Sequence, residues 1–117
     1  MRHHKAKRKL HRVKSQRTAL LRSLARSLVL QEGIVTTVAK AKELRPFVER
    51  LITESKSNTA GSRRAAASIV GNSAETIKKL HDTLAPRYAK RSGGYTRIVR
   101  LGRVGKRMIE SARIEFV

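Results

Sequence analysis

The stretch SQRTALLRSLARSLVLQEGIVTTV, residues 15–38, changes from the repeat of a helix to the repeat of a strand. Ser15 is an acceptable helix N-cap, and Gly33 is a natural C-terminal stop. The β-branched run IVTTV, residues 34–38, then predicts a short strand. The apolar side chains of the first part share one half of a helical wheel, which is typical of an amphipathic helix packed on a core: Leu20, Leu21, Leu24, Ala25, Leu28 and Val29.

The next segment carries the apolar spacing of a second helix in the stretch LRPFVERLI, residues 44–52. Pro46 interrupts this pattern. A helix that begins near Ala39 is expected to kink at the proline, whereas a helix that begins near Arg45 has the proline in its favourable first turn. We favour the long, kinked helix.

Two further helices are predicted between residues 55 and 86. A polar turn, SKSNTAGS, precedes the helix-forming stretch RRAAASIV, residues 63–70. Asn72 or Ser73 is expected to cap the following helix, and Glu75 is placed for a capping box if Asn72 is the cap. Ala85 and Pro86 are expected to end this helix.

The C-terminal part predicts two strands, TRIVRLGR at residues 96–103 and MIESARIEF at residues 108–116, joined by a short turn around residues 105–106. Alternation along the last strand indicates that helices cover one side of the sheet. The order helix, strand, three helices, strand, strand predicts a two-layer α+β fold with about four helices packed on a small three-stranded mixed sheet.

The N-terminal seventeen residues, MRHHKAKRKLHRVKSQR, contain eight Lys or Arg, three His and no acid. Such a segment repels itself and lacks the apolar side chains that a core needs. We therefore expect a basic, extended, RNA-binding tail at residues 1–14 and a single α+β domain at residues 15–117.

Composition narrows the classes of function. Lys and Arg number 28 against 8 Asp and Glu, a formal charge of +20, so the expected partner is a polyanion. The chain has no cysteine, which excludes disulfides, thiolate chemistry and Cys-based zinc sites. Neither a membrane-spanning run nor a signal peptide is recognisable, which predicts a soluble intracellular protein.

Catalysis, metals and cofactors are not expected. The acids are scattered and mostly adjoin Lys or Arg, as surface charges do. His3, His4 and His11 lack carboxylate or thiolate partners for a closed metal site, and His81 stands alone on a helix. The two glycines of SGGY lack the setting of a phosphate-binding loop. The sequence therefore predicts a protein that is not an enzyme.

The cations predict nucleic-acid binding, with RNA preferred over DNA. A small basic nucleoid protein is the alternative, yet helix-turn-helix spacing, zipper heptads and a β-ribbon arm are not recognisable. Aromatics are only 3%, which disfavours a stacking platform; Tyr88 and Tyr95 either stack on a base or ribose, or pack in the core. The candidate RNA-binding residues are Arg2, His3, His4, Lys5, Lys7, Arg8, Lys9, His11, Arg12, Lys14, Arg17, Arg22, Arg63, Arg64, Arg87, Tyr88, Lys90, Arg91, Tyr95 and Arg97.

Several ordered blocks carry a family likeness: MRHHKAKRKLHR, QRTALLRSLARSLVLQEGIVTT, AKAKELRPFVERLIT and PRYAKRSGGYTRI. Together they resemble the bacterial-type large-subunit ribosomal protein seventeen family along nearly the whole chain. The departures are His4 and Lys7 in the tail and the absence of a longer C-terminal extension.

This resemblance implies a structural, non-enzymatic protein bound to the ribosome. The bacterial cytoplasm is expected instead of an organelle, because no Ser-rich cleavable presequence precedes the MRHHK start. Its partners would be large-subunit ribosomal RNA and neighbouring large-subunit ribosomal proteins, near the rim of the peptide exit tunnel. No membrane, small-molecule substrate or cofactor is implied.

Overall fold

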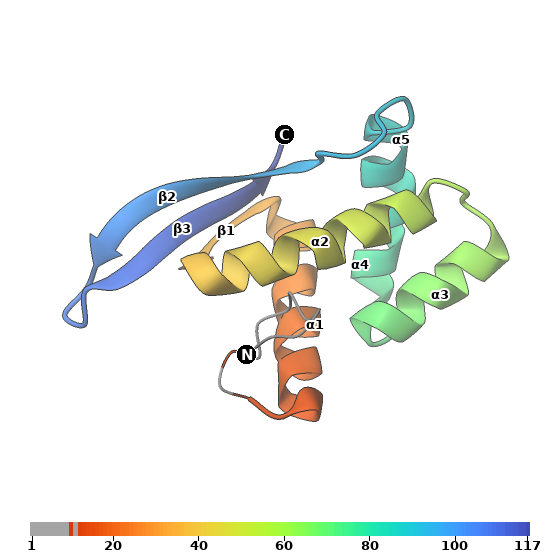
Figure 1. Cartoon of the computed structure of the whole chain (residues 1–117). Coiled ribbons are helices and arrows are strands. Elements are labelled where there is room, and N and C mark those ends of the chain that lie inside the picture. Colours follow the sequence, from red (N-terminus) through yellow and green to blue (C-terminus); the bar gives the residue numbers. More distant parts are fainter. Residues whose placement is uncertain (1–9, 11) are drawn as a thin grey trace, which may run out of the picture.

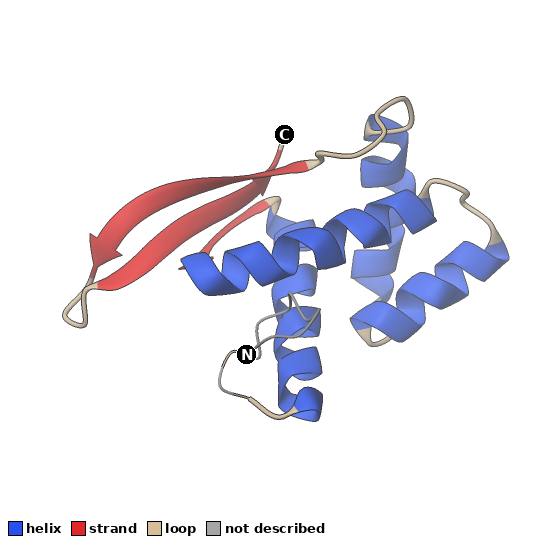
Figure 2. Cartoon of the chain, in the orientation of Figure 1, coloured by secondary structure: helices blue, strands red, loops and turns tan. Residues whose placement is uncertain are grey.

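The computed structural model describes residue 10 and residues 12–117, and within them an α+β fold (Figures 1 and 2). The elements are α1 (Lys14–Gln31), β1 (Gly33–Thr37), α2 (Val38–Ser55), α3 (Ala60–Val70), α4 (Ala74–Lys79), the π-helical turn η1 (Leu80–Leu84), α5 (Ala85–Arg87), β2 (Thr96–Val104) and β3 (Ile109–Phe116). Because α4, η1 and α5 follow one another without a break, the predicted four helices and three strands are confirmed.

The sheet has the strand order β1-β3-β2, and both pairings are antiparallel. The prediction of a mixed sheet was wrong. The turn after β2 makes β3 antiparallel to it, and β1 pairs with the other edge of β3 instead of lying beside β2. Residues 33–37 of β1 pair with residues 111–115 of β3, in a register that sets Ile34 opposite Ile114.

The helix termini differ from the expected caps at several points. Val13, not Ser15, is the N-cap of α1, and its side chain makes no capping hydrogen bond. The C-cap is Glu32, in the left-handed conformation with φ 64°, so this helix ends one residue before Gly33. Ser73, not Asn72, is the N-cap of α4, and its side chain makes no capping hydrogen bond to the backbone. The left-handed φ of 63° at Asn72 excludes the proposed capping box with Glu75.

The long second helix is confirmed. It begins at Val38 after Thr37, whose side chain accepts a hydrogen bond from the Lys40 amide at 3.2 Å, and it continues through Pro46. The following helix starts three residues earlier than expected, because Thr59 and Ser62 form a reciprocal capping box. Side-chain caps therefore fix both starts.

The core lies between the helices and one face of the sheet. Its members include Leu28, Leu44 and Ile114, each with no exposed surface. Burying one such side chain contributes about 1.5–3 kcal/mol. The expected inward face of β3 is confirmed at Phe116. On α1, Ala25 and Val29 belong to the core, whereas Leu20 neither belongs to it nor packs against it.

A two-stranded ribbon, residues 99–110, extends away from the body of the molecule, and we call it the hairpin arm (Figure 1). The pairing of β1 with β3 ends at Ser111, so β2 and β3 continue without β1 beyond that point. Every residue of the arm is exposed. The expectation that the chain has no β-ribbon arm was wrong, since alternation alone gives strand positions and does not show where a third strand stops.

Candidate nucleic-acid interface

Some of the predicted cations have hydrogen-bond or ion-pair partners within the protein, and others have none among the described residues. Arg2, His3, His4, Lys5, Lys7, Arg8, Lys9 and His11 lie outside the described residues. At the start of α1, the Arg12 guanidinium donates to the Leu10 carbonyl at 3.0 Å, and Arg17 donates to the Arg12 carbonyl at 3.2 Å. Lys14 is exposed beside them. These groups leave a basic helix N-terminus with no acid in its first turn.

Arg22 and Arg26 lie on the face of α1 that meets the C-terminus of α3. Arg22 Nη2 donates to the Ser68 carbonyl at 3.2 Å, and Arg26 Nη1 donates to the Val70 carbonyl at 2.8 Å. Carbonyls of a last helical turn lack helix partners and carry the negative end of the macrodipole. These contacts give both guanidinium groups acceptors inside the protein, including that of Arg22, a candidate RNA-binding residue.

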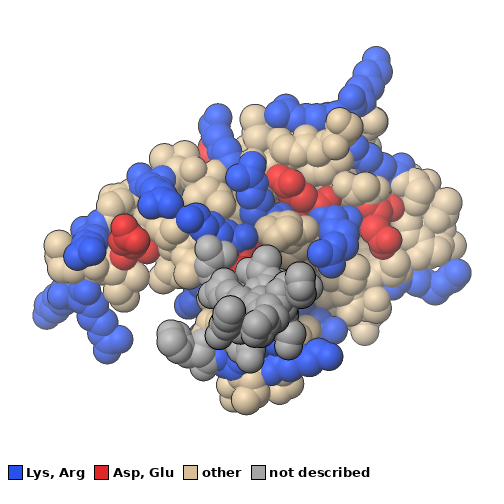
Figure 3. All heavy atoms as spheres, viewed as in Figure 1, with Lys and Arg blue, Asp and Glu red and all other residues tan. Residues whose placement is uncertain are grey.

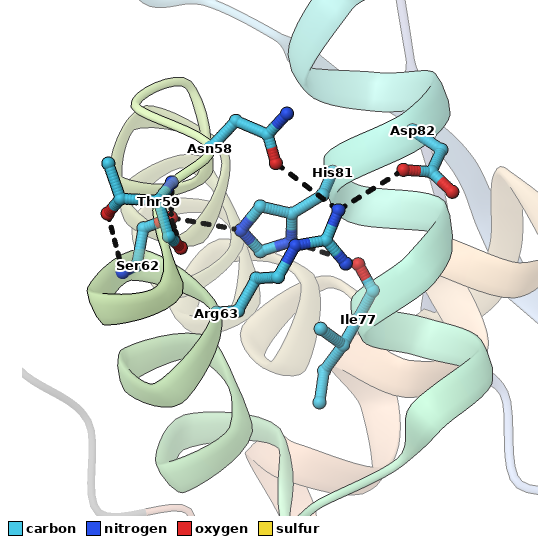
Figure 4. Close-up of polar contacts among 7 residues, drawn as sticks. All are labelled: Asn58, Thr59, Ser62, Arg63, Ile77, His81 and Asp82. Carbon is cyan, nitrogen blue, oxygen red and sulfur yellow. Dashed lines mark hydrogen bonds and ion pairs between the residues drawn. The ribbon is translucent and has the colours of Figure 1, made fainter.

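Arg63 belongs to a polar cluster between α3 and the helix that follows it (Figure 4). Its Nη2 donates to Asn58 Oδ1 at 3.2 Å and lies 3.3 Å from Asp82 Oδ1. Arg64, the next residue, is exposed and has no hydrogen bond or ion pair among the described residues. The predicted pair therefore divides into one bridging arginine and one open arginine.

His81 lies in the same cluster and is 1% exposed (Figure 4). Its Nδ1 is 3.0 Å from the Ile77 carbonyl, which only accepts, so Nδ1 carries the proton. Its Nε2 faces the Ser62 hydroxyl at 3.2 Å. Because both side chains are buried and the pair has no open approach, the arrangement holds two helices together and does not form a nucleophile.

Glu32 joins α1 to the helix that precedes the basic loop. Arg87 Nη1 lies 2.5 Å from Glu32 Oε1, and Lys79 Nζ lies 3.2 Å from Glu32 Oε2. The hydrogen bond from Arg87, opposed by burial and helped by Lys79, lowers the pKa of Glu32 below its usual value. The same pairing raises the pKa of Arg87. Arg87 is thus partly committed to a structural ion pair.

The two tyrosines beside the basic loop are core residues. Tyr88 is 3% exposed and Tyr95 1%, and their ring centroids lie 5.1 Å apart. Tyr88 donates to the Val117 carbonyl at 2.7 Å, and Tyr95 donates to the Arg91 carbonyl at 3.2 Å. Of the two alternatives that the sequence left open, burial favours packing in the core over stacking on RNA. Their function in the fold is to hold the basic loop in place.

The loop itself presents cations outward. Lys90 and Arg91 are exposed, and Arg91 Nε donates to the Gly93 carbonyl at 3.3 Å. Lys56, the C-cap of α2, donates to the Arg91 carbonyl, and its Nζ lies 4.7 Å from the Tyr95 ring centroid. This anchoring fixes the loop backbone and leaves the Lys90 and Arg91 side chains facing solvent. Such an arrangement suits contact with an anionic surface.

At the root of the hairpin arm, Arg97 and Arg113 share one carboxylate. Arg97 Nη2 lies 2.7 Å from Glu115 Oε2, and Arg113 Nε lies 3.0 Å from Glu115 Oε1. The hydrogen bond from Arg97 is the largest cause of a lowered pKa at Glu115. One carboxylate between two guanidiniums leaves this place with a net positive charge.

The candidate list omitted the arm cations Arg100, Arg103, Lys106 and Arg107. All four are exposed, and within the described part of the chain none has a hydrogen bond or ion pair. Figure 3 shows Lys and Arg gathered toward the end of the arm, with one acidic patch beside them. The density of cations in residues 97–107 was the available signal, but the candidate list stopped at Arg97.

Neither a metal-binding cluster nor a membrane-spanning helix is found among the described residues. Residue 10 and residues 12–117 contain no cluster of three or more His, Asp or Glu side chains arranged to hold a metal ion. In the same part of the chain, no helix has the length and apolar character needed to cross a bilayer. Fold and surface thus define the class: a small α+β protein with a basic exterior.

Comparison with known proteins identifies the family within this class. The sequence profile of the family described as Ribosomal protein L17 matches residues 20–117. The "Large ribosomal subunit protein bL17" of Gemmatimonas aurantiaca is 51% identical over 117 residues, which are 100% of this chain and 98% of that protein. The protein of the same name from a Hydrogenobaculum species is 52% identical over 118 residues, covering 100% of this chain and 99% of that protein.

The chain therefore belongs to the ribosomal protein L17 family. Membership confirms the predicted family, the non-enzymatic class and the localisation on a bacterial cytoplasmic ribosome.

Proposed function

We propose that this chain is a structural constituent of the large ribosomal subunit that binds large-subunit ribosomal RNA. The observation that carries the proposal is the family match, because relatives named as large-subunit proteins are about half identical along the full chain. The contacts are made by the basic tail, residues 1–14, and by the basic loop, residues 87–95. The same family likeness supports a position near the rim of the peptide exit tunnel, beside other large-subunit proteins.

The charge distribution gives this proposal its physical mechanism. Internal partners hold Arg26, Arg63 and Arg87, whereas Arg64, Lys90 and the outer part of the loop remain open to solvent. Each open cation that meets a phosphate releases counterions, so affinity falls steeply with salt. Arg is favoured over Lys where a phosphate is held by two parallel hydrogen bonds.

The tail and the domain contribute separately. The sheet and the core lie within residues 15–117, whereas the tail supplies mainly charge and few apolar side chains. We propose that the tail acts on RNA while the domain provides the folded core.

Sedimentation of a cell lysate at moderate and then at high salt tests the proposal. The chain is expected to migrate with large subunits and to remain there above the salt that strips loosely bound basic proteins. Migration with the nucleoid, or release as a free monomer at modest salt, would instead support the DNA-binding alternative. Within purified large subunits, crosslinks from this chain to proteins of the exit-tunnel rim test the proposed position.

A further inference from the structure

The hairpin arm carries two chemically different faces, and a β-bulge creates this separation. The β2–β3 register sets Arg100 opposite Ala112 and Arg103 opposite Glu110, with an irregularity between Arg100 and Gly102. Opposed residues share a face, and Ala112 and Glu110 are two apart on one strand. The extra residue, Leu101, therefore brings Arg100 and Arg103 to the same face, whereas regular alternation would separate them.

The opposite face of the arm is apolar. Val104 lies opposite Ile109 in the register, and the two side chains are 48% and 43% exposed. Val99 is 45% exposed on the same face nearer the body, where it lies opposite Arg113, while Glu110 shares the other face with Arg103. One ribbon thus has a cationic side and an apolar side, with Lys106 and Arg107 in the turn at its end.

The arm also lacks the support that a free ribbon needs. An isolated two-stranded hairpin is at best marginally stable in water. β1 supports the ribbon only up to the level of Ser111, so the residues beyond Arg100 have no third strand, and residues 99–110 are all exposed. They contain four cations against the single acid Glu110. Because charge dominates and the cations have no protein acceptors among the described residues, the covering partner is expected to be anionic.

We propose that the hairpin arm is a second RNA-binding element, whose Arg100 and Arg103 face lies on the phosphate backbone of double-helical ribosomal RNA. The wide, shallow minor groove of such RNA is flanked by phosphates that a projecting ribbon reaches without reading bases. This inference rests on the proposed function and adds a contact region to it, separate from the tail and the basic loop.

Two double variants of the full chain, one on each face of the arm, test the proposal. Arg100→Ala with Arg103→Ala removes the cationic face, and Val104→Thr with Ile109→Thr changes the apolar face of the same ribbon. Binding of each purified chain to large-subunit ribosomal RNA is measured by filter retention over a range of salt. The arginine variant is expected to reduce the log-log salt slope by about 1.5, since each phosphate contact contributes about 0.7–0.9. The threonine variant keeps the slope of the native chain.

The outcomes separate the arm from the function as a whole. Native binding with an unchanged slope in the arginine variant would overturn the arm proposal and leave the proposed function standing, whereas failure of the native chain to bind would contradict the function itself. Crosslinking of reconstituted large subunits gives a second test. If a crosslink between the arm and another ribosomal protein is lost in the threonine variant alone, the arm docks on protein and the proposal is overturned.

Directed cleavage provides a check that does not depend on affinity. The chain has no cysteine, so Lys106→Cys places a single iron chelate at the end of the arm. Hydroxyl radicals from this position are expected to cut ribosomal RNA at a confined set of nucleotides in reconstituted particles. The cysteine-free native chain gives the background, and cleavage no greater than that background would overturn the proposal.

Discussion

Replacement of Arg26 by Ala separates cations that hold the fold from cations that bind RNA. Arg26 Nη1 donates to the Val70 carbonyl at 2.8 Å in a half-buried position. A hydrogen bond to a charged group contributes about 1.5–3 kcal/mol, and a cation at a helix C-terminus about 0.3–1 kcal/mol. The end of α3 keeps its backbone bonds from Gly71 and Asn72 to Ala67, so we expect the lower part of this range, about 1–2 kcal/mol.

Thermal unfolding of the full chain measures this loss. For a domain of this size, about 1 kcal/mol corresponds to roughly 4 °C in Tm, so Arg26→Ala is expected to lower Tm by about 4–8 °C. Its salt slope for ribosomal RNA binding stays at the native value. The matched control is Arg64→Ala, an exposed arginine of α3 without an internal partner, which is expected to reduce the slope and leave Tm unchanged. A native Tm together with a reduced slope in Arg26→Ala would refute the capping assignment.

Three further predictions concern the acid limb, the tail and the core. Because Arg87 lowers the pKa of folded Glu32, the stability from this ion pair is present above the unfolded pKa and lost as pH falls through the folded pKa. Glu32→Gln is therefore expected to lower Tm at pH 7. At the acid end of a series of Tm against pH, the variant and the native chain are expected to have the same Tm. Arg8→Ala with Arg12→Ala should weaken RNA retention without a change in Tm, and a large loss of Tm would mean that the tail packs on the domain. Tyr95→Phe, which removes two hydrogen bonds of a buried hydroxyl, should cost about 1–2 kcal/mol in urea unfolding while the RNA salt slope is retained.

Local patterns predicted the helices and strands well, because the apolar period reports which side of an element meets a core. The second helix was placed correctly through Pro46, and the inward face of β3 was correct at Ala112, Ile114 and Phe116. The relative direction of the strands depends on pairing between residues about 80 apart in sequence, such as Ile34 and Ile114. Alternation within a single strand carries no information on that pairing, which explains the error of a mixed sheet.

The candidate site was predictable in its charge and not in its partners. Density of cations identified a basic exterior, but only the folded arrangement shows that Arg22 and Arg26 meet the end of α3. The same limit applies to Tyr88 and Tyr95, whose sequence context beside a basic loop fits a ring on RNA as well as a ring in the core. Their burial depends on Phe116 and the loop, which pack around them in the folded chain and are not adjacent to both rings in sequence.

Competition between large-subunit ribosomal RNA and duplex DNA is the most direct measurement of the central claim. The labelled full chain is bound to ribosomal RNA at moderate salt and challenged with increasing amounts of unlabelled RNA or DNA, at equal phosphate concentrations. The account predicts that unlabelled ribosomal RNA displaces the chain at concentrations where DNA does not. Equal displacement by the two polyanions would contradict it, because the basic surface would then recognise charge alone.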